Sequence, residues 1–147
     1  MFRIFGLISD FANKKGLKTD FIVVTLAKKY IDCSDFMQKK GLNNDQVLVI
    51  LAKNGVDLSD FAQKKGISND SIIVTLAKQN LDYAAFAHNK SISNDQVLVI
   101  LAKNNIDVSD FAQTKGINNE QVLLTLAKNN VDLYNSFLKK VFPISKY

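Results

Sequence analysis

Few residues of this sequence have the chemistry needed for catalysis or metal binding. The 147-residue chain contains one histidine, His88, and one cysteine, Cys33, so it lacks the ligand set of a zinc site. It also lacks a glycine-rich phosphate loop, a nucleophile elbow and a zincin motif. We therefore predict that the protein is not an enzyme and has no catalytic residues, no cofactor and no metal ion.

Acidic residues are more numerous, and they recur at a step of 25 residues. One series is Asp32, Asp57, Asp82, Asp107 and Asp132, and a second is Asp20, Asp45, Asp70, Asp95 and Glu120. Paired carboxylates could serve acid–base catalysis. The same positions suit helix N-caps and first turns, where a negative charge is favoured by about 0.3–1 kcal/mol. Capping also explains the repetition, and it is the interpretation we favour.

Lysines form two further series with the same step. The first is Lys15, Lys40, Lys65, Lys90, Lys115 and Lys140, and the second is Lys28, Lys53, Lys78, Lys103 and Lys128. As two rails, they could contact the phosphates of a nucleic acid. Alternatively, each lysine lies in the last turn of a helix, where the dipole favours a cation. The second interpretation also accounts for the acidic series.

These series belong to a 25-residue repeat that organises the chain. Phe11, Phe36, Phe61, Phe86 and Phe111 fall in register, and five repeats cover about 7–31, 32–56, 57–81, 82–106 and 107–131, followed by a cap over 132–147. Repeats of this length are typical of stacked units that share one core. We predict a single domain, 1–147, that is all-α: a right-handed α-solenoid of five helix-turn-helix repeats with N- and C-terminal caps.

Each repeat predicts two short helices. The first begins at Asp57 and ends at Gly66, which suits a left-handed C-cap. The second covers about 70–80, and its closing residues, Gly55, Asn80, Asn105 and Asn130, tolerate a positive φ. The apolar run VLVIL is also compatible with a strand, but the capping box formed by Ser93 and Gln96 favours a helix.

The second helix has an outer face with a repeated composition. If residues 47, 48, 51, 52 and 55 face the core, then Gln46, Val49 and Lys53 point away from it. The candidate binding face is therefore Gln46, Val49, Lys53, Val74, Lys78, Gln96, Val99, Lys103, Gln121 and Lys128. Its valines are either covered by neighbouring helices or form an apolar stripe that contacts a partner.

Charge and composition narrow the class of partner. The net charge is +5, but the excess lies in residues 1–31 and 132–147, whereas residues 32–106 are neutral. A nucleic-acid track would be more evenly basic. We predict a protein partner or self-association, with DNA or RNA binding as the alternative, no membrane span, no small-molecule substrate and a cytoplasmic location.

The fourth repeat departs from the others at Tyr83, Ala85, His88, Asn89 and Ser91. These residues replace a first-turn acid and a favoured glycine C-cap. They form either a local binding spot around Tyr83 and His88 or a repeat that has drifted.

The stretch FAQKKGISNDSIIVTL resembles a bacterial helix-turn-helix, because Phe61, Ala62, Gly66, Ile67 and Ile72 match the packing positions of that motif. The resemblance covers all five repeats, with Met37 and Ser91 as departures. It implies the turn geometry and, in that family, DNA binding by the second helix.

The stretch DQVLVILAKNG resembles the first helix and base-reading loop of TAL-effector repeats. The resemblance implies that Asn54-Gly55, Gln79-Asn80, Asn104-Asn105 and Asn129-Asn130 are variable pairs that read bases. The chain departs from that family in its shorter repeat and in lacking Gly-Gly after the pair.

Overall fold

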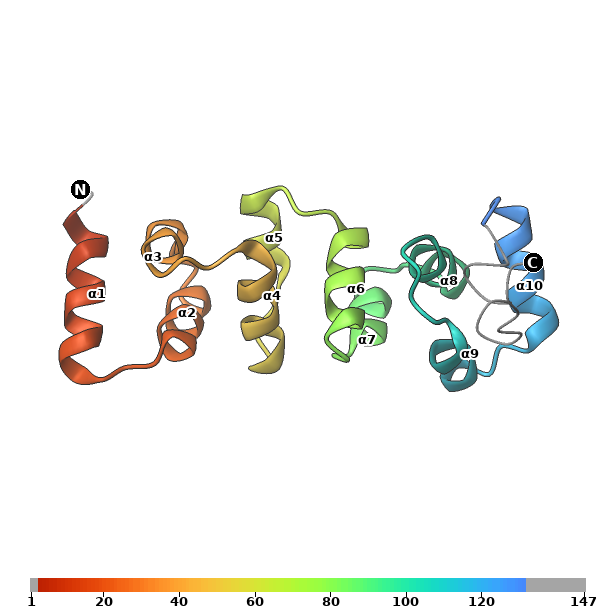
Figure 1. The fold of residues 1–147 in the computed structure, drawn as a ribbon, viewed down its shortest axis with the longest axis horizontal. Coiled ribbons are helices and arrows are strands. Elements are labelled where there is room, and N and C mark those ends of the chain that lie inside the picture. The colour runs from red at the N-terminus through yellow and green to blue at the C-terminus, as the bar shows by residue number, and fades with distance from the viewer. Residues whose placement is uncertain (1–2, 132–147) are drawn as a thin grey trace, which may run out of the picture. The chain divides into compact units, whose positions relative to one another are not determined.

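The computed structural model describes residues 3–131, and within this range the chain forms helices and no strand. In chain order they are α1 (Arg3–Lys15), α2 (Thr19–Lys28), α3 (Ser34–Lys40), α4 (Asn44–Lys53), α5 (Ser59–Lys65), α6 (Asn69–Lys78), α7 (Tyr83–Asn89), α8 (Asn94–Lys103), α9 (Ser109–Lys115) and α10 (Asn119–Lys128) (Figure 1). This confirms the all-α prediction, including a helix rather than a strand for both VLVIL runs. The expected C-terminal cap, with Asp132 and Lys140, lies outside the described residues.

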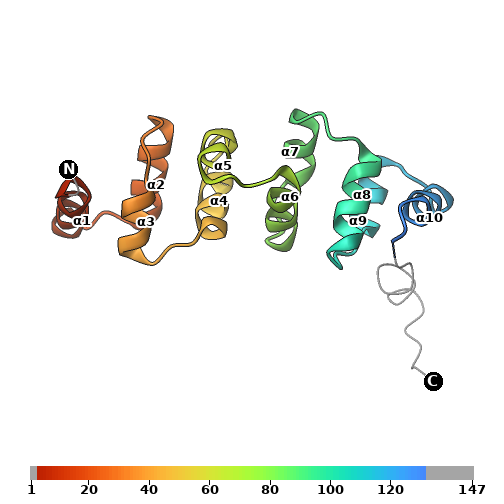
Figure 2. The same cartoon turned by 90° about the horizontal axis from the view of Figure 1, so that it is seen from above.

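The chain divides into two compact units, an N-terminal unit of residues 1–68 and a C-terminal unit of residues 69–147. Inside the N-terminal unit, α2 packs against α4 and α1 packs against α3 (Figure 2). Inside the C-terminal unit, α6 contacts α7 and α8, while α8 also contacts α9 and α10. Within each unit, the second helices of successive repeats are therefore direct neighbours. The single domain expected over 1–147 stays a prediction.

Among the second helices of the repeats, α4, α8 and α10 begin with a side-chain cap at the N-terminus. In α4, the Asn43 side chain accepts from the Gln46 backbone N–H at 2.8 Å, and the Gln46 side chain accepts from the Asn43 N–H at 2.8 Å. Ser93 and Gln96 form the same reciprocal pair at the start of α8. This confirms the capping box expected at Ser93, and it satisfies two backbone donors that the helix leaves free.

The helices end through left-handed residues that recur with the repeat. The first helices α3, α5 and α9 close on glycine, and Gly66 has φ +66°. After α4, the N–H of Gly55 donates to the Ala52 carbonyl at 3.1 Å, and the next N–H, of Val56, donates to the Leu51 carbonyl at 2.9 Å. These two bonds close the helix and turn the chain into the next element. The predicted positive φ at residues 55, 80, 105 and 130 is confirmed.

The aspartates near the first helices cap in two different ways. Asp82 is the N-cap of α7 and accepts from the Ala85 N–H at 2.9 Å, as predicted. Asp57 instead lies one residue before the N-cap of α5 and accepts from the Ser59 N–H at 2.9 Å. The helix therefore begins two residues after the predicted cap, because an Asx-type turn comes before it. The bonds from Ser34 to Asp32 and from Ser109 to Asp107 follow the same pattern.

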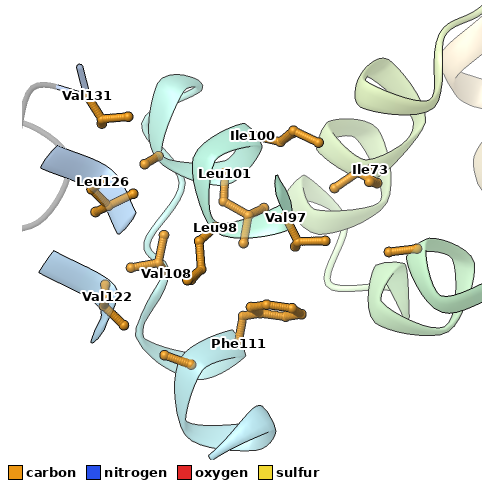
Figure 3. Packing of buried hydrophobic residues seen from close by; sticks show 13 residues of the cluster. Ile73, Val97, Leu98, Ile100, Leu101, Val108, Phe111, Val122, Leu126 and Val131 are labelled. Atoms are coloured by element: carbon orange, nitrogen blue, oxygen red, sulfur yellow. The ribbon is translucent and has the colours of Figure 1, made fainter. Parts of the chain in front are cut away.

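The core of the C-terminal unit is a cluster of aliphatic side chains with one phenylalanine (Figure 3). Leu98 and Leu101 of α8 are fully buried at its centre, and Phe111 of α9 and Leu126 of α10 pack around them. In the N-terminal unit, Leu48 and Leu51 of α4 are buried likewise. Since these helices have only seven or ten residues, their stability depends on this packing.

Among the described helices, none has both the length and the apolar character needed to cross a bilayer.

Candidate functional site

The predicted binding face is divided between exposed polar residues and half-buried apolar ones. Positions i, i+3 and i+7 of a helix share one side, so Gln46, Val49 and Lys53 lie on one face of α4. The face residues that are exposed are Gln46, Lys53, Lys78, Gln96, Lys103, Gln121 and Lys128. Val49, Val74 and Val99 are half-buried.

The valines of the C-terminal unit make up part of its core. Val74 and Val99 pack against the buried cluster of that unit, so neighbouring helices cover one side of each. Leu124 occupies the same repeat position in α10 and is 50% exposed. In the N-terminal unit, Phe21 of α2 takes the position of the glutamines and is 57% exposed. Sequence reasoning missed Phe21, although its departure from the glutamine pattern is visible in the alignment of the repeats.

The glutamines of the face have a structural task as well. The side-chain oxygens of Gln46 and Gln96 accept the N-cap hydrogen bonds described above. Both glutamines are nevertheless exposed. Helix capping therefore explains why these two positions are glutamine, and no binding partner is needed to explain it.

The lysines at the ends of the first helices divide in a similar way. Lys15, Lys40 and Lys115 are exposed, whereas Lys65 and Lys90 are half-buried. The Lys65 ammonium donates to the Ser34 hydroxyl. Two others lie over aromatic rings, Lys90 at 5.8 Å from the Phe86 centroid and Lys115 at 5.9 Å from the Phe111 centroid. Such cation–π contacts stabilise the folded chain and draw these lysines away from an external phosphate.

The residue pairs compared with base-reading loops close helix ends. Asn54, Asn104 and Asn129 each donate a side-chain hydrogen bond to the carbonyl four residues earlier, at 2.8, 2.8 and 2.7 Å. The second member of each pair supplies the left-handed residue. The asparagine side chains thus cap the last turn of α4, α8 and α10.

Tyr83 and His88 of the fourth repeat differ in how far they are buried. Tyr83 is half-buried, and its ring lies 5.8 Å from the Phe111 ring, tilted by 32°. Desolvation raises the pKa of the Tyr83 phenol, and the negative charges of Asp110 and Asp82 add to this. His88 is exposed on α7. The described residues contain no group of three His, Cys, Asp or Glu side chains that could hold a metal ion.

A pocket of about 460 Å³ lies inside the N-terminal unit, and Lys28 and Lys65 of the two predicted lysine series line it. Its walls come from the end of α2 and the turn after it, from the end of α4, and from α5. Leu51 and Phe61 provide apolar surface, Asp60 and Lys64 provide charge, and the buried Cys33 lies in the wall. Pockets of this volume suit small organic molecules.

Two lysines of α5 fasten one wall of this pocket. The Lys64 ammonium donates to the Tyr30 carbonyl at 3.2 Å and pairs with the Asp60 carboxylate at 3.2 Å. Lys65, which is also on α5, donates a hydrogen bond to the Ser34 hydroxyl. Both bonds cross from α5 to residues more than thirty positions earlier, so they hold the turn after α2 close to α5.

The Cys33 thiol is a poor nucleophile in this setting. Burial raises its pKa, and the neighbouring Asp32 charge raises it further. Less thiolate is therefore present at neutral pH than for an exposed cysteine. The thiol is part of the wall of the pocket, and the charges of Lys65 and Lys64 lower its pKa by less than burial and Asp32 raise it.

A smaller pocket of about 260 Å³ lies in the C-terminal unit. It is lined by Asp70, Asp95, Gln96, Val99, Ile100 and Asn129. It therefore brings Gln96 and Val99 of the candidate binding face beside the start of α6 and the end of α10.

Comparison of the chain with protein-family models, with curated proteins and with solved structures gives no significant match.

Proposed function

We propose that the protein is a non-enzymatic repeat scaffold that binds another protein through the outer face of its second helices. In this proposal the five repeats stack as a right-handed α-solenoid with a cap at each end. The cytoplasmic location is part of the proposal, because a single buried thiol needs no oxidising compartment.

The regular spacing of the helices supports the stacked architecture. The second helices α4, α6, α8 and α10 begin at residues 44, 69, 94 and 119, and each has ten residues. Within each unit, second helices of successive repeats contact one another. Helices of the same length that pack in the same way form a surface whose composition repeats. Solenoid proteins use such repeating surfaces to bind extended partners.

One observation carries the choice of a protein partner: large apolar side chains are exposed on the repeated face. Phe21 is 57% exposed on α2 and Leu124 is 50% exposed on α10. Exposed lysines lie one or two turns further along the same helices, at Lys28 and Lys128. Aromatic and aliphatic anchors with a polar rim are the usual composition of a protein-binding surface.

Pull-down from native lysate, followed by reconstitution with the purified partner, tests the proposal. We expect Phe21→Ser combined with Leu124→Gln to abolish binding of that partner without unfolding the chain, since both side chains are largely exposed. Gln63→Ser combined with Gln113→Ser is the matched control, because both glutamines are exposed on first helices. Unchanged binding by the double face variant, or a strictly monomeric protein that captures no partner, would contradict the proposal.

Binding of DNA or RNA by the lysines is the second candidate function. The observation in its favour is that Lys28, Lys53, Lys78, Lys103 and Lys128 are all exposed at the ends of the second helices. Phosphate contacts predict an affinity that falls steeply with salt. Changing Lys53, Lys78 and Lys103 to Glu is then expected to abolish binding of a duplex probe. Unchanged binding would rule out nucleic-acid binding by this lysine series.

A further inference from the structure

The pocket of the N-terminal unit has a counterpart in the C-terminal unit, displaced by 50 residues along the chain. Ten of its sixteen lining residues keep their type at this displacement, including Asp60 and Phe61, which correspond to Asp110 and Phe111. The walls are therefore built alike, and the few exchanged residues decide what fills the space between them.

In the C-terminal unit, a tyrosine fills this corner. Tyr83 packs against the buried cluster, and its ring lies 5.8 Å from that of Phe111. Figure 3 shows Phe111 at the edge of the cluster, with one side turned toward its aliphatic core. Together with burial, the charge of Asp110 raises the pKa of the Tyr83 phenol, as does that of Asp82, so both carboxylates belong to the surroundings of this ring.

In the N-terminal unit, the residue at the corresponding position is Cys33. Its side chain is far shorter, so the volume of a phenol ring is left open between it and Phe61. Gly55 also lines the pocket, and the exposed Asn105 stands at the corresponding position of the C-terminal unit. The result is the pocket of about 460 Å³ with Asp60 on its wall.

The mouth of the pocket carries a strained aromatic residue. Tyr30 lines the pocket with φ +60°, at a repeat position where the later repeats have Gly55, Asn80, Asn105 or Asn130. A tyrosine in the left-handed region costs about 1–2 kcal/mol relative to a permissive residue. Its side chain is 72% exposed, so packing does not repay this cost. Strained residues of this kind concentrate at binding sites.

We propose that this pocket binds a small molecule containing a phenol ring, which takes the place that the Tyr83 side chain occupies in the other unit. The ring stacks on Phe61, and its hydroxyl donates a hydrogen bond to the Asp60 carboxylate. Tyr30 covers the ring from the mouth of the pocket. This site shares Lys28 with the rim of the protein-binding face, but the proposal is independent of the one for that face.

Titration of the full chain with p-cresol, the side-chain analogue of tyrosine, tests this assignment. We expect saturable NMR shifts for residues around Cys33 and Phe61, and slower modification of Cys33 by a thiol reagent as p-cresol fills the pocket. Cys33 is the only cysteine of the chain, so the second readout reports on this site alone. Toluene, which lacks the hydroxyl, is expected to bind more weakly.

Four variants decide the outcome. Cys33→Tyr supplies the ring covalently, so it is expected to abolish the p-cresol shifts, whereas Cys33→Ala keeps the space and keeps binding. Cys33→Leu, with the residue type found at the buried Leu58, also fills the pocket and serves if the tyrosine variant does not fold. Asp60→Asn is expected to reduce the preference for p-cresol over toluene. Non-saturable shifts, or equal shifts in the parent chain and in the filled variants, would overturn the proposal.

Discussion

The ten residues NDQVLVILAK occur twice, as α4 in the N-terminal unit and as α8 in the C-terminal unit, and the two copies are buried to different extents. In α4 the buried residues are Val47, Leu48 and Leu51. In α8 the corresponding three residues are buried, and Ile100 and Ala102 are buried as well. Identical sequence is therefore buried more deeply in the second unit, where α8 contacts α6, α9 and α10.

The surroundings of Cys33 and of Tyr83 differ in the same way, because the packing is again more complete in the C-terminal unit. The C-terminal unit uses a tyrosine to complete its packing, while the N-terminal unit leaves a pocket. Together, the two differences indicate that one repeated framework supplies a closed core in one unit and an open site in the other.

The largest expected effect comes from truncating Ile100, because this isoleucine is buried in α8 whereas its equivalent in α4 is only half-buried. Ile100 is 9% exposed, so Ile100→Ala is expected to lower the free energy of unfolding by about 2–4 kcal/mol. Ile50 is only half-buried, and Ile50→Ala is expected to cost clearly less. Urea unfolding of both variants measures the difference. Equal losses would show that the two helices are equivalent in solution.

Opening the closed corner is expected to have the next largest effect. Tyr83→Cys removes the ring contact with Phe111 and part of the core packing, so we expect a loss of about 2 kcal/mol. The variant is also expected to gain a second p-cresol site, detected as new NMR shifts near Phe111. Tyr83→Phe is the control, because it keeps the ring. If Tyr83→Cys were as stable as the parent, the Tyr83 side chain would not contribute to the stability of the core.

Local features of the fold were predictable from sequence, because they depend on residues a few positions apart. Gly66 ends α5 and Ser93 begins α8 as expected, since each acts on its own turn. The start of α5 was predicted at Asp57 but lies two residues later, because aspartate can cap a helix or form an Asx-type turn just before it.

The pocket and the unequal burial could not be predicted in this way. Ile50 and Ile100 have identical neighbours in sequence, so only tertiary contacts distinguish them. The pocket depends on the space between Cys33, which precedes α3, and Phe61 of α5, and these two residues are far apart in the sequence. Its sequence signal is that a few lining residues, among them Tyr30, Cys33 and Gly55, differ in type from the residues found 50 positions later.

A smaller and opposite effect is expected at the mouth of the pocket. Tyr30→Asn places a residue that tolerates the left-handed region at φ +60°, as in three later repeats. We expect the free energy of unfolding to rise by about 0.5–1 kcal/mol, while binding of p-cresol weakens. Asn80→Tyr is the matched change in the C-terminal unit and is expected to destabilise it. A Tyr30→Asn variant that gains stability and keeps full binding would remove Tyr30 from the site.

The alkaline titration of the two units is expected to differ because of Tyr83. Burial and the Asp110 charge raise its pKa above the value near 10 of the unfolded chain. The folded state therefore holds this proton more tightly, and the stability linked to it is present below pH 10 and lost as the pH rises through the raised pKa. Ultraviolet titration should show a late phenol that disappears in Tyr83→Phe. The same late step should appear in Cys33→Tyr if Asp60 corresponds to Asp110.

The smallest expected effect lies at low pH, at the turn that begins α3. Hydrogen bonds from the Ser34 side chain and backbone lower the pKa of Asp32. The folded state therefore releases this proton more readily, and the linked stability is present above the unfolded value near 4 and lost as the pH falls through the lowered pKa. Alanine occupies the corresponding position of the C-terminal unit, at Ala84. Ser34→Ala removes the hydroxyl bond and the partner of Lys65, so NMR titration should show the pKa of Asp32 moving up toward its ordinary value. An unchanged pKa would mean that the backbone N–H of Ser34 alone keeps the pKa of Asp32 low.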